Sequence, residues 1–444
     1  MENRVDEFIK NPKKALLTLA LPMIIAMIVQ VMYNVVDTAF VGRLGADAIA
    51  ALTFSFPIFF ILIALNSGLG VGMSSRISRF LGEKRKEDAE NTAMHGLFIS
   101  IIFGLFIFVG GIIFLRPIFS IFGAANSVLE LSIDYMSIIL FGIFFMFSSF
   151  MLNNIFSSQG DTKTPMKVQI FALILNIILD PIFIYVLGYG VKGAAIATVI
   201  AFALSLILFI YYIKKKSYLK IHLSSFKFSF SLVKEIFLIG LPASLMMLLI
   251  SVYFMFINKF MAYFGTNYVA SFGIASRLES VITMPIVALS IAMLTLVGMF
   301  FGAKRYELLK EISWYGIKIS ILFASAIGVV FFLLPSLFLR IFTPDATLLA
   351  ISSAYLRIEI FIFPLFAVSM IISRVMQGMG FGMPGLVINL VRTLLISVPL
   401  AYIFVFILKY GYLSIAAATI IGGVISSIVA IIWMEIEFKK IESR

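Results

Sequence analysis

The chain has 444 residues, of which 62% are hydrophobic and 13% are charged, and its formal net charge is +12. No soluble domain can bury that much apolar side chain, so the composition excludes a soluble protein and indicates an integral membrane protein. The basic residues lie in short segments between apolar runs, as topology signals do, so no nucleic-acid partner is expected. Because the chain has no cysteine, disulfides and thiolate metal sites are excluded.

Apolar runs of about 20 residues or more predict spanning helices. Such runs follow one another at residues 15–41, 49–75, 92–115, 134–156, 167–187, 192–213, 236–262, 270–300, 315–339, 348–373, 385–408 and 412–435. The turns between them carry glycine, proline and charge. The predicted fold class is therefore an all-α integral membrane protein with twelve transmembrane helices.

The basic residues of the turns are unevenly divided between the two sides of the membrane. Most of them, including the runs 84–86 and 214–216, lie on the side that also holds both termini. The opposite side carries only Arg43, Arg116, Lys192, Arg340 and Lys409. The positive-inside rule then predicts a multi-pass protein of the cell membrane with both termini in the cytoplasm.

Several motifs recur 220 positions apart, which indicates an internal repeat. "LALP" ending at Pro22 returns as "IGLP" ending at Pro242, "RLGADAIAA" (43–51) resembles "YFGTNYVAS" (263–271), "LGEKR" (81–85) returns as "FGAKR" (301–305), and Tyr135 returns as Tyr355. Both halves start on the same side, so the repeats are parallel. We predict an N-terminal six-helix lobe at 1–213, a cytoplasmic linker at 214–235 and a C-terminal six-helix lobe at 236–444, with the two lobes around a central cleft.

Four acidic residues fall inside predicted spans: Asp37, Asp180, Glu279 and Glu359. An ionised carboxylate in hydrocarbon is energetically costly, so each needs a partner, a proton or a water-filled cavity. A structural ion pair or a capped kink is the alternative interpretation for each of them.

In the first half, Asp37, Asp180 and Thr198 fall at similar depth. At ~1.5 Å per residue, all three lie roughly 6–11 Å from the outer ends of their helices. Asn176 precedes Asp180 by one helical turn on the same face. Carboxylate, amide and hydroxyl oxygens are the hard ligands that a small cation prefers, so these four residues form the predicted cation site.

A polar stripe in the first apolar helix extends this site. Gln30, Tyr33, Asn34 and Asp37 follow the spacing i, i+3, i+4, i+7, which places them on one helix face. Pro181, directly after Asp180, has no backbone N–H and so frees the carbonyl of Ile177.

The second half lacks these acids, because Ile257 stands at the position of Asp37 and Val398 at that of Asp180. The polar cluster is therefore not expected to repeat. That half instead carries Arg277, Glu279, Arg357, Glu359 and Arg392. For these residues we expect a buried network in which arginine and glutamate neutralise each other.

The segments "YNVVDTAFVGRLGADAIAA", "SQGDTKTP" and "NIILDP" resemble the multidrug and toxic compound extrusion (MATE) family, and the resemblance covers essentially the whole chain. It implies efflux of bulky, often cationic compounds in exchange for H⁺ or Na⁺. In the prokaryotic branch with an acidic first helix, the cation-site motif falls on Asp37, Asn176, Asp180 and Thr198. The family's drug contacts fall on Gln30, Tyr33 and Asn153, to which we add Asn34 from the polar stripe.

Another branch of that family uses a carboxylate on its seventh helix. Here residues 242–260 contain none and include Lys259, so coupling through the C-terminal lobe is not expected.

The function predicted from these observations is secondary antiport of organic cations or drug-like compounds, with H⁺ or Na⁺ as the coupling ion. The protein is expected to act as a monomer and to need no cofactor. The alternative is a flippase for a lipid-linked oligosaccharide, whose pyrophosphate would suit Arg277, Arg357 and Arg392. The sequence has no nucleophile–base pattern and no phosphate-binding loop in a suitable context, so an enzyme is not expected. His95 and His222 are too isolated for a metal site, so interface roles are expected for both.

Overall fold

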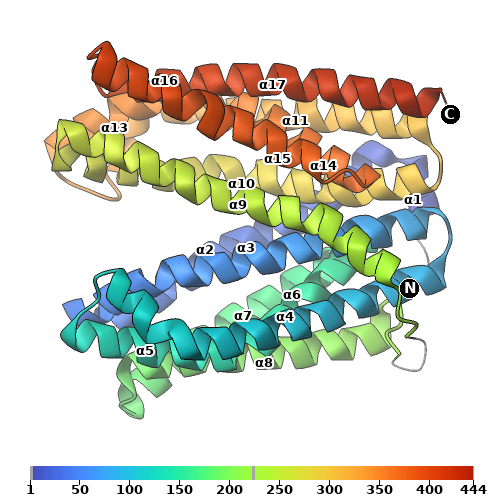
Figure 1. The fold of residues 1–444 in the computed structure, drawn as a ribbon, viewed down its shortest axis with the longest axis horizontal. Coiled ribbons are helices and arrows are strands. Elements are labelled where there is room, and N and C mark those ends of the chain that lie inside the picture. Colours follow the sequence, from blue (N-terminus) through green and yellow to red (C-terminus); the bar gives the residue numbers. More distant parts are fainter. Residues whose placement is uncertain (1–3, 223–225, 444) are drawn as a thin grey trace. The chain divides into compact units, whose positions relative to one another are not determined.

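The computed structural model describes residues 4–222 and 226–443, except for the side chain of Asn34. These residues form helices and turns and no strand. The first half contains α1 (Val5–Lys10), α2 (Pro12–Gly42), α3 (Ala46–Gly82), α4 (Lys86–Ile121), α5 (Asn126–Phe141), α6 (Ile143–Ser158), α7 (Lys163–Pro181), the π-helical turn η1 (Ile182–Val186) and α8 (Gly190–Lys216) (Figure 1).

The second half begins with the long helix α9. It contains α9 (Phe230–Phe264), α10 (Thr266–Gly302), α11 (Tyr306–Leu333), α12 (Pro335–Leu339), α13 (Ala346–Glu359), α14 (Ile362–Met379), α15 (Met383–Leu390), η3 (Val391–Ser397), α16 (Val398–Tyr402), η4 (Ile403–Ile407) and α17 (Leu413–Glu442).

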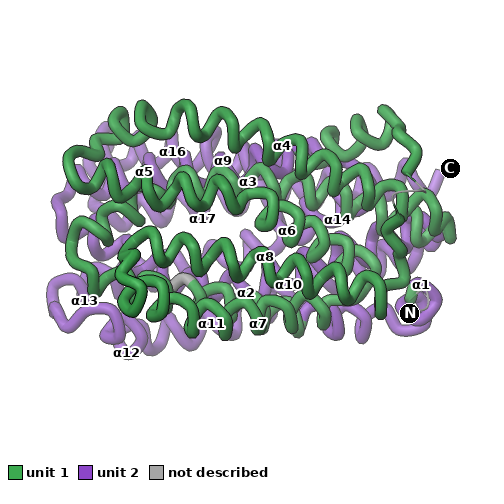
Figure 2. Tube along the Cα trace, turned by 90° about the horizontal axis from the view of Figure 1, so that it is seen from below, with its two compact units in different colours: residues 1–4, 21–240 green, residues 5–20, 241–444 purple. Residues whose placement is uncertain are grey.

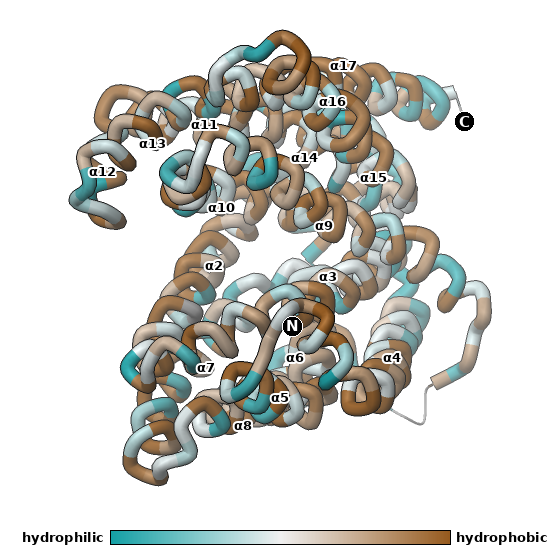
Figure 3. The backbone as a smooth tube through the Cα atoms, turned by 60° about the vertical axis from the view of Figure 1, so that its left-hand side comes forward, coloured by the Kyte–Doolittle hydropathy of each residue, from teal (hydrophilic) through white to brown (hydrophobic). Residues whose placement is uncertain are grey.

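Among the described residues, 11 helical segments are long and apolar enough to cross a membrane, or 12 if the bent pair α5–α6 is one span. The higher number agrees with the twelve predicted spans. Figure 3 shows apolar residues along most of the helices. Many of these apolar side chains are exposed, for example Phe106 at 75% and Ile121 at 82%, as expected for surfaces that contact lipid.

Two of the predicted spans are interrupted. The fourth bends by 52° between α5 and α6, at Gly142. The tenth is divided where α13 ends at Glu359 and α14 begins at Ile362. Pro364 lies in the first turn of α14, where its missing N–H removes no helical hydrogen bond.

The chain forms two compact units, which Figure 2 distinguishes by colour. Unit 1 contains residues 21–240 together with Arg4, and unit 2 contains residues 5–20 and 241–443. The divisions fall within α2 and α9, directly before Leu21 and Leu241, each of which precedes one of the repeated prolines. The described linker residues 214–222 and 226–235 therefore belong to unit 1, and the first turns of α2 belong to unit 2.

Two of the repeated motifs form the same turns in both halves. Gly45 and Gly265 precede α3 and α10 with φ of 115° and 124°, a region that disfavours residues with a Cβ. Lys84 and Lys304 adopt φ of 61° and 56° just after the ends of those helices. At each of these ends the next residue's N–H returns to a carbonyl five positions back, at 2.9 Å, which closes the helix as a Schellman motif does.

Candidate functional site

The C-terminal end of α7 carries a buried amide and a buried carboxylate in contact. Asn176 Nδ2 donates a hydrogen bond of 2.9 Å to Asp180 Oδ1, and both residues are fully buried. The predicted i, i+4 alignment is therefore confirmed. Asn176 Oδ1 and Asp180 Oδ2 are also buried, and neither has a hydrogen-bond partner among the residues that the structure describes.

Asp37 on α2 completes a pair of carboxylates with Asp180. Its side chain is 9% exposed, and within the described part of the chain its buried Oδ1 accepts no hydrogen bond. Asp37 and Asp180 are close enough to interact electrostatically across α2 and α7. Among the described residues, three buried oxygen atoms, from Asp37, Asn176 and Asp180, thus lack a donor. Buried acceptors of this kind are rarely left without a partner.

Thr198 on α8 joins this site through a tyrosine. The hydroxyl of Tyr33 donates a hydrogen bond of 3.0 Å to Thr198 Oγ1, which links α2 to α8 one turn before Asp37. Tyr33 is a predicted substrate contact, and in this structure its hydroxyl is bonded to Thr198, one of the predicted cation ligands.

Tyr135 on α5 is a member of the cluster that the analysis of the sequence did not identify. It interacts electrostatically with Asp37, Asp180 and Tyr33. The signal that could have identified it is its match with Tyr355 in the internal repeat. With Tyr135, the cluster draws side chains from α2, α5, α7 and α8, all of them in unit 1.

The other predicted substrate contacts lie apart from this hydrogen-bonded cluster. Gln30 is exposed on α2, and Asn153 is half-buried on α6. No hydrogen bond between described residues joins either of them to the cluster. Asn34 falls in α2, but its side chain lies outside the described residues.

The chain does not continue regularly after Asp180. Pro181 ends α7, and η1 follows with its N–H groups reaching one residue further back than in an α-helix. The bond from Leu187 N to Ile182 O, at 2.8 Å, has this π-type spacing. Single π-turns of this kind are frequent at functional sites.

Unit 2 repeats part of this arrangement, so the prediction that the polar cluster does not repeat is wrong in part. Tyr253 and Thr419 are hydrogen-bonded at 3.0 Å between α9 and α17, as Tyr33 and Thr198 are between α2 and α8. The position of Asp37 is occupied by Ile257, which is fully buried. The tyrosine–threonine bond therefore belongs to the repeated fold, whereas the acids at these positions do not.

The prediction of a buried arginine–glutamate network is also wrong. Glu279 on α10 and Glu359 on α13 lie close enough to interact electrostatically with each other, and each has one buried oxygen, Oε1 of Glu279 and Oε2 of Glu359, with no hydrogen-bond partner among the described residues. No ion pair between described residues connects either to an arginine. Arg277 and Arg357 are exposed instead, because each lies two residues from its glutamate and so points to another helix face.

His95 on α4 has the expected interface role. It is 2% exposed, its Nδ1 lies 2.8 Å from the carbonyl of Asn91, and its Nε2 accepts a hydrogen bond of 2.9 Å from Ser229 N. The rings of Phe226 and Phe228 pack on the imidazole, with centroids at 4.8 and 5.9 Å. His95 therefore anchors the end of the linker to unit 1.

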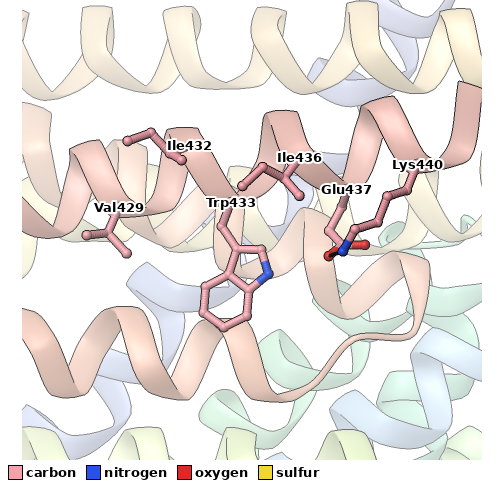
Figure 4. A pocket seen from close by; sticks show the side chains of 6 residues that line it. All are labelled: Val429, Ile432, Trp433, Ile436, Glu437 and Lys440. Carbon is pink, nitrogen blue, oxygen red and sulfur yellow. Dashed lines mark hydrogen bonds and ion pairs between the residues drawn. The ribbon is translucent and has the colours of Figure 1, made fainter.

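A pocket of about 310 Å³ lies elsewhere, on α17 in unit 2 (Figure 4). Its lining combines apolar side chains, one tryptophan and an ion pair of 2.8 Å between Lys440 and Glu437: Val429, Ile432, Trp433, Ile436, Glu437 and Lys440. Tryptophan beside a lysine near the end of a spanning helix is typical of the membrane–water interface. The pocket contains none of the predicted site residues.

Comparison with known proteins places the chain among transporters. The family model described as MatE matches residues 22–182 and 242–403, that is, once in each half from the equivalent prolines onward. A Bacillus subtilis (strain 168) protein named as the probable multidrug resistance protein YoeA is 29% identical over 391 residues, which cover 86% of this chain and 84% of that protein.

Two further relatives extend the comparison. A Shewanella oneidensis protein named as an FAD transporter is 29% identical over 398 residues, or 87% of each chain. A solved outward-facing structure of a multidrug resistance MATE family transporter of the MOP superfamily has a TM-score of 0.94 and 33% identity, with 99% of each chain covered.

Proposed function

The chain belongs to the MATE family of multi-pass membrane transporters, and from this premise we propose that it is an antiporter that exports organic cations or drug-like compounds in exchange for H⁺ or Na⁺. The observation that carries this proposal is the pair Asp37–Asp180 with three buried oxygen atoms that have no donor among the described residues. Two carboxylates in one apolar surrounding repel each other, so the site favours any cation that reaches it.

The exchange follows from this shared charge. A proton or Na⁺ that binds between Asp37 and Asp180 neutralises part of the negative charge, and the site then holds a cationic substrate less strongly. When the coupling ion leaves, the carboxylates attract the next cation. Ion and substrate therefore compete through charge and need not share contact atoms. Asn176 and Thr198 supply the neutral oxygens that a bare Na⁺ would need in addition.

Pro181 and η1 provide the place where the helix can change shape between these states. A π-turn contains one residue more than an α-helical turn and can rearrange without loss of a complete turn of hydrogen bonds. In this proposal α2, α7 and α8 repack around η1 when the charge of the pair changes.

An anionic substrate is the competing candidate. The relative named as an FAD transporter favours it, and the exposed side chains of Arg277 and Arg357 provide cations in unit 2. A flippase for a lipid-linked oligosaccharide would use the same positive charge. The pair Asp37–Asp180 favours the cationic substrate, because it places negative charge in unit 1.

Orientation and assembly complete the proposal. From the distribution of basic residues we infer that both termini lie in the cytoplasm and that the protein is in the cell membrane. Since the acid pair is formed by a single chain, we expect a monomer to be sufficient for exchange.

Transport by purified protein in lipid vesicles tests the proposal. Efflux of a fluorescent organic cation is followed while a pH gradient and a Na⁺ gradient are imposed separately, and FAD serves as the anionic alternative. We expect at least one gradient to drive the cation and neither to drive FAD. Transport of FAD but not of the cation would overturn the proposed substrate class, and cation movement that ignores both gradients would overturn antiport.

A further inference from the structure

Tyr185 connects the two helices that carry the acid pair. Its hydroxyl donates a hydrogen bond of 2.5 Å to the backbone carbonyl of Phe40. The two rings also pack edge to face, with centroids 6.4 Å apart and planes at 68°. Tyr185 lies in η1 and Phe40 in the last turn of α2. The Phe40 carbonyl also accepts a hydrogen bond of 3.2 Å from Arg43 N in the turn that follows α2, so the tyrosine hydroxyl is a second donor at this helix end.

This contact lies close to both carboxylates along the chain. Tyr185 follows Asp180 by five residues, and Phe40 follows Asp37 by three. One turn before Asp37, on the other side, Tyr33 donates its hydrogen bond to Thr198. Asp37 therefore lies on a stretch of α2 that is attached at both ends by a tyrosine hydroxyl, to α8 at one end and to η1 at the other.

The π-turn itself has a rigid support on its other side. A Cβ on Gly193, in the first turn of α8, would lie 2.5 Å from the carbonyl oxygen of Phe183 and 2.8 Å from the nitrogen of Ile184. The backbone of η1 thus rests directly on α8. A hydroxyl held by this turn is a firm point of attachment for α2.

The second repeat has the same ring contact without the hydroxyl. Phe260 stands at the position of Phe40, and Phe406 is the fourth residue of η4 as Tyr185 is of η1; their centroids are 5.7 Å apart and their planes are at 73°. Counted from these π-turns, Ala401 stands at the position of Asp180, where the sequence comparison predicted Val398. Phe406 lies in η4, the π-turn that corresponds to η1. Ile257 stands at the position of Asp37. Within this chain, the hydroxyl is present in the repeat that has the acid pair and missing from the repeat that lacks these acids.

We propose that Tyr185 is a positioning residue for the coupling-ion site: its hydrogen bond to the Phe40 carbonyl holds α2 against η1 so that Asp37 faces Asp180. This role rests on the proposed function and assigns to it a residue outside the ligand set. The ring packing alone serves the fold, as Phe260 and Phe406 do in unit 2. The hydroxyl of Tyr185 is needed for the position of Asp37 in the coupling-ion site.

The test uses Tyr185→Phe, which gives unit 1 the ring contact of unit 2. The matched control is Tyr189→Phe, since the Tyr189 ring stacks on Phe183 at 6.5 Å while its hydroxyl makes no hydrogen bond to any residue that the structure describes. Binding of a fluorescent organic cation to purified full-length protein is measured first in alkaline, Na⁺-free buffer. It is then measured at rising H⁺ and, separately, at rising Na⁺, with thermal unfolding recorded for every variant.

We expect Tyr185→Phe to bind the dye within about twofold of wild type when no coupling ion competes. It should require about three- to tenfold more H⁺ or Na⁺ for half-displacement, the range that one lost hydrogen bond to a neutral acceptor produces. Tyr189→Phe should match wild type in both measurements. A structural role alone would lower the unfolding temperature and leave the displacement curve in place.

Each other result decides a different question. A wild type that responds to the ion and a Tyr185→Phe variant with the same displacement curve would overturn the role of Tyr185 and leave the proposed function intact. A wild type whose dye binding ignores both ions would overturn the proposed function and this role with it. A shift of equal size in Tyr189→Phe would show that loss of any hydroxyl in this region suffices, and would also overturn the role.

Discussion

Tyr33 and Thr198 are joined by a hydrogen bond of 3.0 Å that holds α2 to α8 one turn from Asp37. Unit 2 contains the same bond, between Tyr253 and Thr419, on the corresponding helices and at the same length. The contact therefore belongs to the repeated fold and does not depend on the proposed ion site, because it is made with Asp37 on the same helix in unit 1 and with Ile257 at the equivalent position in unit 2. In unit 1 it also fixes the hydroxyl oxygen of Thr198 near the carboxylates.

The two bonds allow stability to be separated from ion binding. Tyr33→Phe and Tyr253→Phe each remove one half-buried hydroxyl and should each lower the free energy of unfolding by about 1 kcal/mol. Only Tyr33→Phe should change the dependence of dye binding on H⁺ or Na⁺. Thermal unfolding and dye displacement on the same preparations check both statements. An equal change of ion dependence in Tyr253→Phe would contradict the assignment of the site to unit 1.

The close approach of η1 to α8 predicts a strong effect of one methyl group. Gly193→Ala would place its Cβ against the Phe183 carbonyl, a backbone atom that cannot move alone, and overpacking of this kind costs about 1–3 kcal/mol. Gly110→Ala is the control, because nothing lies within 4 Å of its Cβ position. We expect a lower unfolding temperature and weaker ion dependence for Gly193→Ala only. Unchanged values for both would mean that η1 is not held as the structure shows.

His95 predicts a specific weakness of the linker. Its Nε2 accepts from Ser229 N, so the proton of the neutral ring lies on Nδ1, towards the Asn91 carbonyl. His95→Phe keeps a ring in contact with Phe226 and Phe228 but leaves the backbone N–H of Ser229 without its acceptor. We expect faster tryptic cleavage after Lys227 in this variant and wild-type rates in His222→Ala. Equal cleavage rates in wild type and His95→Phe would contradict the anchoring role.

Much of the fold and part of the site could be predicted from the sequence, because both depend on regular spacing. Long apolar runs define spans, and the 220-residue repeat defines the halves. The contact between Asn176 and Asp180 needs only the i, i+4 rule, and Thr198 follows from depth alone. Gly142 and Pro364 mark the two interrupted spans, although the predicted runs passed through both.

Contacts between different helices could not be predicted from spacing along the sequence. Periodicity states which residues share a face, but not which helix that face meets, so Tyr135 and Tyr185 were not placed near the acids. The prediction of an arginine–glutamate network was wrong for a related reason. Arg277 and Glu279 are close in sequence, yet residues two apart on a helix point in different directions. The charged group that interacts with Glu279 is 80 positions away, at Glu359.

The orientation in the membrane can be tested directly because the chain has no cysteine. Single cysteines in place of Lys84 and Lys215 should react with an impermeant thiol reagent only after the cytoplasmic side is opened. A cysteine in place of Lys409 should react in intact cells. The positive-inside rule is the physical reason for this expectation. Labelling of the Lys215 position in intact cells would reverse the proposed topology.

The acid pairs of the two units should differ in function. Asp37→Asn and Asp180→Asn each remove an ionisable ligand and should abolish ion-coupled efflux while the protein stays folded. Glu279→Gln should preserve efflux and should not lower stability, because it removes one of two carboxylates that interact in an apolar surrounding and keeps the size and polarity of the side chain. Efflux in vesicles under imposed gradients and thermal unfolding separate the two effects. If well-folded Glu279→Gln lost coupled efflux while Asp37→Asn retained it, the coupling ion would have to bind in unit 2, at Glu279 and Glu359.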